Sequence, residues 1–65
     1  MQSLLKRATA GDADAQCELG KAHVHGNGVV KDHKKAVEWL SKAAAQKHAD
    51  ASTMMGYAFA NSLYD

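Results

Sequence analysis

Apolar side chains recur along this chain at the spacing of an α-helix, three and four positions apart, and no segment alternates cleanly between apolar and polar residues. The clearest stripe lies within residues 33–46 and consists of Ala36, Trp39, Leu40, Ala43 and Ala44. A shorter one lies within residues 13–25 and consists of Ala15, Leu19, Ala22 and His23. Such stripes place their members on one face of a helix. The pattern predicts four helices, over residues 2–9, 13–25, 33–46 and 49–62.

The composition supports an all-α fold. The chain has 65 residues, of which 13 are alanine, and it contains no proline and no isoleucine. Alanine has the highest helix propensity, whereas strands are enriched in β-branched residues. A chain of this length forms at most one small domain with a modest core. Its single cysteine cannot form an internal disulfide.

The segment between the second and third predicted helices contains Gly26-Asn27-Gly28. A dinucleotide-binding loop with this start would follow a strand and would have a third glycine at position 31, where this chain has Lys31. A turn explains the glycines better, because Gly26 can take the positive φ that ends a helix and Gly28 can provide the second bend. We expect Asp32 to be the N-cap of the next helix.

A repeat of 36 residues is the most informative feature of the sequence. When the chain is shifted by 36 positions, 8 of the 29 overlapping pairs are identical. The identical positions include Leu4 with Leu40, Gly20 with Gly56, and Ala-Asp-Ala at 13–15 with 49–51. A period in the thirties with two helices per unit is typical of helical solenoids.

Several short motifs follow one another in a fixed order through the central part of the chain. They are Ala15-Gln16, Leu19-Gly20, Gly26-Asn27-Gly28-Val29, Asp32, Lys35-Ala36, Trp39-Leu40 and Lys42-Ala43-Ala44. In order and spacing they resemble the Sel-one-like repeat, a relative of the tetratricopeptide repeat. The resemblance implies an all-α helix-turn-helix solenoid, with about four antiparallel helices in a right-handed superhelix. It implies one full repeat at 11–46, the second helix of a preceding unit at 1–10, and the first helix of a following, incomplete or terminal unit at 47–65.

Five positions depart from the pattern of that family. His23 stands where the family usually has an aromatic side chain, His33 where it often has one, and Lys47 where it has a glycine. Ser62 and Tyr64 replace the two loop glycines in the last unit. These departures imply a degenerate or terminal unit. They also predict a positive φ at Lys47, which a residue other than glycine adopts at a cost of about 1 kcal/mol.

The four histidines raise the question of a metal site. In a helix, His23 and His25 point about 200° apart, so they cannot bind one ion from the same face. His33 follows the loop, and no cysteine or carboxylate stands at a spacing that completes a zinc site. We expect His23 to fill a core position and to donate to a backbone carbonyl, and His25, His33 and His48 to face solvent. A His-based metal site is the third alternative for function, after the two hypotheses below.

Nothing in the sequence points to catalysis, so we predict a protein that is not an enzyme and has no cofactor. A reactive Cys17 would need a base or a positive field beside it, and none is identified. Asp12 and Asp14 lie near a helix start, where negative charge is favoured. The net charge of +1 provides no basic field for nucleic acid. No apolar run approaches the length that spans a bilayer, so we expect no membrane insertion, and the compartment stays open.

The first hypothesis for function is an interaction scaffold that binds a protein or peptide on the concave face of the repeat array. In tetratricopeptide-like stacks the first helix of each unit lines that face, so the resemblance carries ten positions over by register. They are Asp14, Cys17, Lys21, Val24, His25, Asp50, Thr53, Tyr57, Ala60 and Asn61. Within each predicted helix these positions fall on one face. Tyr57 would be the aromatic anchor.

The second hypothesis is self-association. The last predicted helix carries Met54, Met55, Tyr57, Phe59 and Leu63. In a solenoid such a helix packs against a second helix of its own unit, and no such helix is predicted after it. An open apolar face of this kind favours a homodimer through residues 49–62, with or without exchange of helices between chains. The chain would then be a symmetric dimer or a fragment of a longer array.

Overall fold

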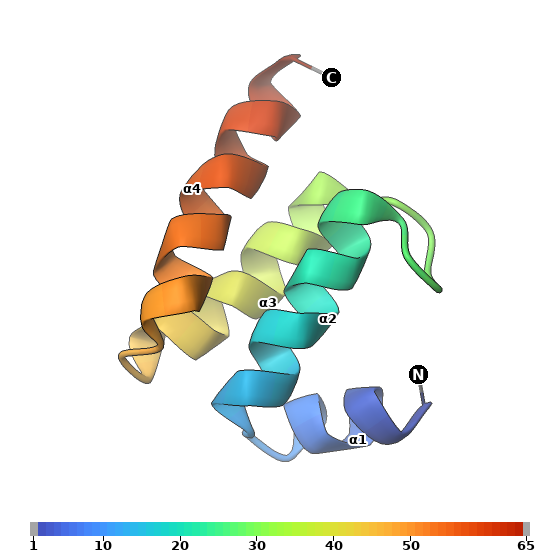
Figure 1. The fold of residues 1–65 in the computed structure, drawn as a ribbon, viewed down its shortest axis with the longest axis vertical. Helices are drawn as coiled ribbons and strands as arrows, with labels where there is room; N and C mark the ends of the chain where they lie inside the picture. Colours follow the sequence, from blue (N-terminus) through green and yellow to red (C-terminus); the bar gives the residue numbers. More distant parts are fainter. Residues whose placement is uncertain (1, 65) are drawn as a thin grey trace.

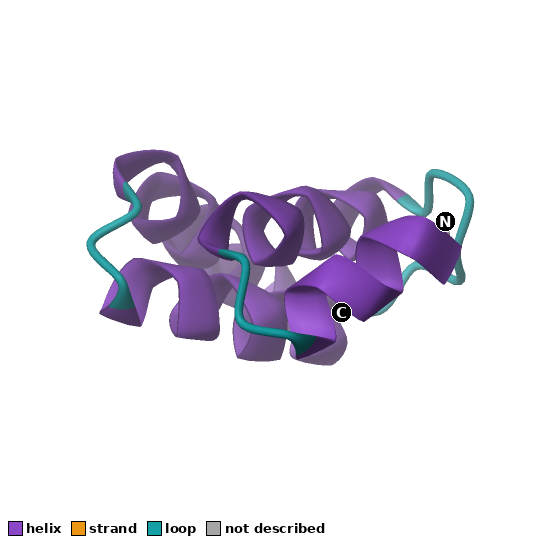
Figure 2. Ribbon diagram, turned by 90° about the horizontal axis from the view of Figure 1, so that it is seen from below, coloured by secondary structure: helices purple, strands orange, loops and turns teal. Residues whose placement is uncertain are grey.

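The computed structural model describes residues 2–64, which form the helices α1 (Gln2–Thr9), α2 (Ala13–His25), α3 (His33–Ala45) and α4 (Ala49–Tyr64). In Figure 1, α2 and α4 run upward, α3 returns between them on the far side, and α1 crosses the lower end of α2. Seen from below, the described part is a flat arrangement of helices joined by short loops, without strands (Figure 2). The predicted all-α fold is confirmed. The third helix ends one residue earlier than predicted, and the fourth continues two residues further.

The loop between α2 and α3 has the predicted turn chemistry. Gly26 has a φ of 70° and Gly28 has a φ of 82°, a conformation that residues with a Cβ rarely adopt. Asp32 then caps α3, because its Oδ1 accepts hydrogen bonds from the N–H groups of Lys34 and Lys35 at 3.0 and 3.2 Å. The glycines and the cap therefore reverse the chain within a few residues and set α3 against α2.

The two other connections are equivalent to each other across the 36-residue repeat. Gly11 has a φ of 104° before α2, and Lys47 has a φ of 64° before α4, which confirms the positive φ predicted for Lys47. Asp12 follows Gly11 and caps α2 with its side chain. His48 follows Lys47 and takes the place of a cap for α4, since its Nδ1 accepts from the N–H of Ala51 at 3.2 Å.

Leu40 lies at the centre of the core and has no exposed surface. It packs so closely against Gly20 that a Cβ added to Gly20 would lie 2.7 Å from Leu40 Cδ2. The main buried cluster joins α2, α3 and α4 and consists of Cys17, Val24, Ala36, Leu40, Ala43, Ala51 and Ala58. A second cluster joins α1 and α2 and consists of Ala8, Ala15 and Leu19, with Leu4 and Trp39 against it. The small side chains let the helices approach closely, as the composition predicts.

Gln16 ties together three parts of the chain from a buried position, with 5% of its surface exposed. Its Nε2 donates to the carbonyl oxygen of Ala8 at 3.0 Å. Its Oε1 accepts from Nε2 of Gln46 at 3.1 Å. The end of α1, the first turns of α2 and the end of α3 are therefore joined through one side chain, whose polar atoms are satisfied.

The histidines differ in exposure. His33 is buried, with 7% of its surface exposed, so the expectation that it faces solvent is wrong. α3 is the central helix and packs against both α2 and α4. Its start lies against α2, since the N–H of Asp32 donates to the carbonyl oxygen of His23 at 2.9 Å. His48 is half-buried because its ring caps α4, whereas His25 is exposed as expected.

Candidate partner-binding surface

The helices α2 and α4 contact each other, run in the same direction (Figure 1) and carry all ten residues predicted to face a partner. Eight of the ten are exposed or half-buried, namely Asp14, Lys21, His25, Asp50, Thr53, Tyr57, Ala60 and Asn61. Tyr57 is the largest apolar side chain among them, with 52% of its surface exposed. The structure thus leaves accessible side chains along two parallel helices.

Cys17 and Val24 do not belong to this exposed surface. They are 2% and 3% exposed, and they pack in the main buried cluster with Ala51 and Ala58 of α4. Their side of α2 faces the neighbouring helix, so α4 covers them. Register on one helix placed them in the groove, but at about 100° per residue Cys17 and Val24 lie at one edge of the predicted face, roughly 40–100° around α2 from Asp14, Lys21 and His25.

Charged side chains gather around Cys17. Burial raises the pKa of the Cys17 thiol more than any other effect. The positive charge of Lys21 lowers this pKa, and the negative charges of Asp50, Glu18 and Asp14 raise it. A reactive thiol needs a lowered pKa and access to solvent, so Cys17 is a core residue rather than a nucleophile. The same charges show that α2 and α4 bring three carboxylates and one ammonium group into the same neighbourhood.

His48 joins the starts of α2 and α4. Its Nε2 lies 2.8 Å from Asp14 Oδ1, while its Nδ1 accepts from the N–H of Ala51. Because an N–H donates to Nδ1, the proton of the neutral ring is on Nε2, which donates to the Asp14 carboxylate. The carboxylate is thereby oriented although 80% of the Asp14 side chain is exposed. Sequence reasoning missed this contact. The available signal was the spacing of 36 residues that places His48 at the position of the helix cap Asp12.

His23 fills the core position predicted for it, with 9% of its surface exposed. Its Nδ1 lies 3.1 Å from the carbonyl oxygen of Val30, and since a carbonyl can only accept, Nδ1 is the donor. Among residues 2–64, no three His, Cys, Asp or Glu side chains come together in a way that could hold a metal ion. The His-based metal alternative therefore has no ligand set within this part of the chain.

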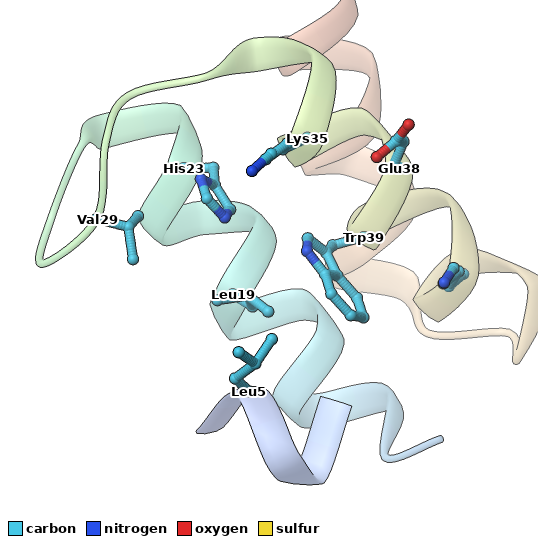
Figure 3. A pocket seen from close by; sticks show the side chains of 8 residues that line it. Leu5, Leu19, His23, Val29, Lys35, Glu38 and Trp39 are labelled. Carbon is cyan, nitrogen blue, oxygen red and sulfur yellow. The ribbon is translucent and has the colours of Figure 1, made fainter. Parts of the chain in front are cut away.

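A hollow that the sequence did not predict lies between α1, α2, the following loop and α3. It has a volume of about 450 Å³ and is lined by Leu5, Leu19, His23, Val29, Lys35, Glu38, Trp39 and Lys42. Figure 3 shows Leu5, Leu19 and Trp39 around the same opening. The ammonium group of Lys42 lies 4.8 Å from the centre of the Trp39 ring. The walls come from separate segments of the chain, so no local pattern reveals the hollow.

The helices α2 and α3 are antiparallel and are joined by a glycine turn, and α4 then repeats the direction of α2. This arrangement defines a helix–turn–helix repeat protein. The family model of the Sel1 repeat matches residues 13–48, which hold α2, α3 and the connection to α4. The chain therefore belongs to the Sel1 repeat family, whose repeats are generally non-catalytic modules for protein–protein interaction. No curated protein and no solved structure matches the chain. Within residues 2–64, no helix has the length and apolar character needed to cross a membrane.

Proposed function

We propose that this chain is an interaction module that binds a peptide segment of a protein partner along the exposed side of α2 and α4. The observation that supports this function is the combination of the exposed aromatic side chain of Tyr57 with carboxylates on two parallel helices. Aromatic side chains dominate the binding energy of many interfaces, because they bury a large apolar area at little cost in conformational entropy. Tyr57 is the anchor and the charged groups select the partner.

The charges on this surface indicate the chemistry of the segment that it takes. Among the ten positions, the carboxylates of Asp14 and Asp50 outnumber the single ammonium group of Lys21, and the hydrogen bond from His48 holds the Asp14 carboxylate in place. A surface with an excess of negative charge favours a partner with positive charge, chiefly through the rate of association and through specificity. The partner segment therefore carries lysine or arginine beside an apolar residue that packs on Tyr57.

The test is the selection of binding peptides from a random display library against the purified chain, followed by titration calorimetry of the selected peptides. We expect enrichment of basic residues beside an apolar one, and a loss of affinity of about tenfold or more with Tyr57→Ala. Lys34→Ala is the matched control, because Lys34 is exposed on α3. Selected peptides that bind Tyr57→Ala and Asp50→Asn as tightly as the parent chain would overturn the proposal.

Self-association through α4 is the second candidate function. Phe59 and Leu63 are 57% and 67% exposed, and with Tyr57 they form the largest group of exposed apolar side chains on one helix of residues 2–64. Exposed apolar surface of this kind is typical of interaction sites. Sedimentation equilibrium over a range of concentrations tests it. A mass that rises toward that of a dimer or larger species supports the candidate, and a monomer at every concentration rejects it.

A further inference from the structure

The contact between Gly20 and Leu40 defines how the first helix of a repeat packs on the second. Through the spacing of 36 residues, Gly56 of α4 is the counterpart of Gly20, and Leu4 of α1 is the counterpart of Leu40. In the proposed division into units 1–10, 11–46 and 47–65, α4 is a first helix and α1 is a second helix. α4 therefore carries the glycine of this helix–helix contact and α1 carries the leucine, at opposite ends of the chain.

The half on α4 is open. Apart from its two chain neighbours and the adjacent backbone of α4, no atom of the described residues lies within 4 Å of a Cβ built on Gly56, whereas a Cβ on Gly20 would overlap Leu40. Phe59 and Leu63, three and seven positions after Gly56, share its side of the helix and are more than half exposed. These three residues are called the α4 docking face. Its shape and chemistry match a helix that brings a leucine side chain against Gly56.

The half on α1 is open as well. Leu4 is half-buried and borders a hollow of about 390 Å³ between α1 and α2. The hollow is lined by Leu4, Glu18, Lys21, Ala22, His25 and Asn27. In the repeat, Leu40 is the counterpart of Leu4, and Ala58 is the counterpart of Ala22. Leu40 and Ala58 have no exposed surface, because α2 packs on both of them. The hollow is thus the place that a helix in the position of a first helix fills.

We propose that a second copy of this chain occupies both open sites, bound head to tail. α4 of one copy lies in the hollow beside α1 and α2 of the next, and Leu4 of the next copy packs on Gly56. This inference rests on the second candidate function and gives it a geometry. The contact joins two different surfaces, so it is heterologous and continues into a row of copies or closes into a ring.

Residues beside the α4 docking face permit this approach. Thr53 and Ala60 are the counterparts of Cys17 and Val24, which pack against α4 within the chain, and both are small and exposed. Asp50 is the only charged residue of α4 and belongs to its first turn. On the α4 side, docking therefore buries apolar and small side chains, and the charged groups at the contact are Glu18 and Lys21 in the lining of the receiving hollow.

A symmetric pairing of α4 with α4 does not have this complementarity. It brings Gly56 against the same helix of another copy, where Phe59 and Leu63 are the large apolar side chains of this face, and it leaves the hollow beside Leu4 open. Head-to-tail docking fills both sites with one contact. It also reproduces between copies the packing that the chain already shows between Gly20 and Leu40.

Cysteine pairing distinguishes these arrangements. In a Cys17→Ala background, Leu4→Cys and Gly56→Cys are prepared as separate single variants, checked for helicity by circular dichroism, and oxidised alone and as an equimolar mixture. We expect a disulfide-linked dimer from the mixture and none from either variant alone. The matched control is Gly20→Cys with Leu40→Cys in one chain, which should close an internal disulfide, because these positions are in contact and a disulfide joins Cβ atoms about 3.8 Å apart.

Each other outcome decides against the proposal. Covalent dimers from Gly56→Cys alone would show symmetric pairing of α4. No linkage in the mixture, with the control closed, would exclude head-to-tail docking. If the unmodified chain still gained mass with concentration in sedimentation equilibrium, the second candidate function would stand and only its geometry would fail. A monomeric chain would overturn both.

A second variant does not depend on oxidation. Gly56→Leu should fold, because the space around Gly56 is open and leucine favours helix more than glycine does. The added side chain fills the site for Leu4 of the next copy, so we expect the concentration needed for association to rise about tenfold or more. Ser41→Ala, at an exposed position of α3 outside the residues of both sites, is the control and should leave association unchanged. Equal association of Gly56→Leu and the parent chain would overturn the proposal.

Discussion

Gly11 and Lys47 occupy equivalent points of the repeat, immediately before the caps of α2 and α4, and both have a positive φ, 104° and 64°. Glycine adopts such a conformation freely, whereas a side chain with a Cβ is strained there. The same turn is therefore relaxed before α2 and strained before α4. The strain is local, and a single substitution at each point tests it.

Lys47→Gly should stabilise the protein by about 1 kcal/mol, because glycine removes the steric strain at a positive φ. For a domain of this size, that corresponds to a rise in Tm of about 4–8 °C. Thermal unfolding followed by circular dichroism measures the change. The reverse substitution, Gly11→Lys, should lower the Tm. An unchanged Tm for Lys47→Gly would mean that α3 does not end in the left-handed conformation.

Gly20→Ala and Gly56→Ala should have opposite effects although the two positions are equivalent in the repeat. A Cβ on Gly20 would overlap Leu40 and lie 3.3 Å from the carbonyl oxygen of Ala36, so Gly20→Ala should cost about 1–3 kcal/mol. Gly56 has open space around it, and alanine is the better helix former, so Gly56→Ala should gain up to about 1 kcal/mol. Urea unfolding at low protein concentration measures both. Similar effects at the two sites would contradict the packing of α2 on α3.

Asp12 should make the stability of the chain depend on pH. The N–H of Ala15 and the guanidinium of Arg7, whose Nη2 lies 3.2 Å from Asp12 Oδ2, lower the pKa of Asp12 in the folded state. Since the folded pKa is below that of the unfolded chain, this contribution is complete above the ordinary pKa of aspartate, about 4, and is lost as the pH falls through the folded pKa.

The variant that isolates this effect is Asp12→Asn, whose amide oxygen can still cap α2 but carries no charge. Its urea midpoint should fall less steeply than that of the parent chain as the pH is lowered from about 5 to about 3. Arg7→Gln should reduce the slope in the same direction but by less, because the backbone hydrogen bond from Ala15 is the larger cause of the lowered pKa. Parallel curves for all three proteins would show that Asp12 does not carry the dependence.

Cys17 should react slowly with a thiol reagent such as dithionitrobenzoate at pH 8 in the folded protein. The side chain is 2% exposed, and burial raises the pKa of its thiol, so both access and thiolate are limited. We expect the rate to increase by about 100-fold or more in urea, where the thiol is exposed. Asp50→Asn removes a carboxylate that raises this pKa and should speed the native reaction slightly. Labelling of native protein at the unfolded rate would place Cys17 on the surface.

The course of the backbone follows from the sequence because it is fixed by short-range chemistry. Helical spacing gave the four helices, Gly26 gave the end of α2 and Asp32 gave the start of α3, each through contacts within a few residues. The resemblance to the family, which has a glycine at the position of Lys47, predicted the positive φ there. None of these features depends on how one helix lies against the next.

What the sequence could not supply is the rotation of each helix toward its neighbours. Cys17 and Val24 share a helical face with exposed residues, yet they are buried because α4 lies beside α2. His33 follows a polar loop, yet the central position of α3 covers it. The bond from His48 to Asp14 spans 34 residues and depends on where two helix starts meet. Such contacts are set by packing between elements rather than by periodicity within one.

The buried amide of Gln16 has a consequence for how the chain loses its structure. Its donor is used by Ala8 and its acceptor by Gln46, so opening either neighbour leaves a polar group without a partner in an apolar setting. Arrays of repeats can melt from one end when adjacent units are weakly coupled. Here the Gln16 amide couples α1 to the end of α3 through α2. Fraying of α1 therefore destabilises the hydrogen bond between Gln16 and Gln46 at the end of α3. Residues 2–46 should accordingly melt cooperatively, as a single all-or-none unit, rather than in successive steps.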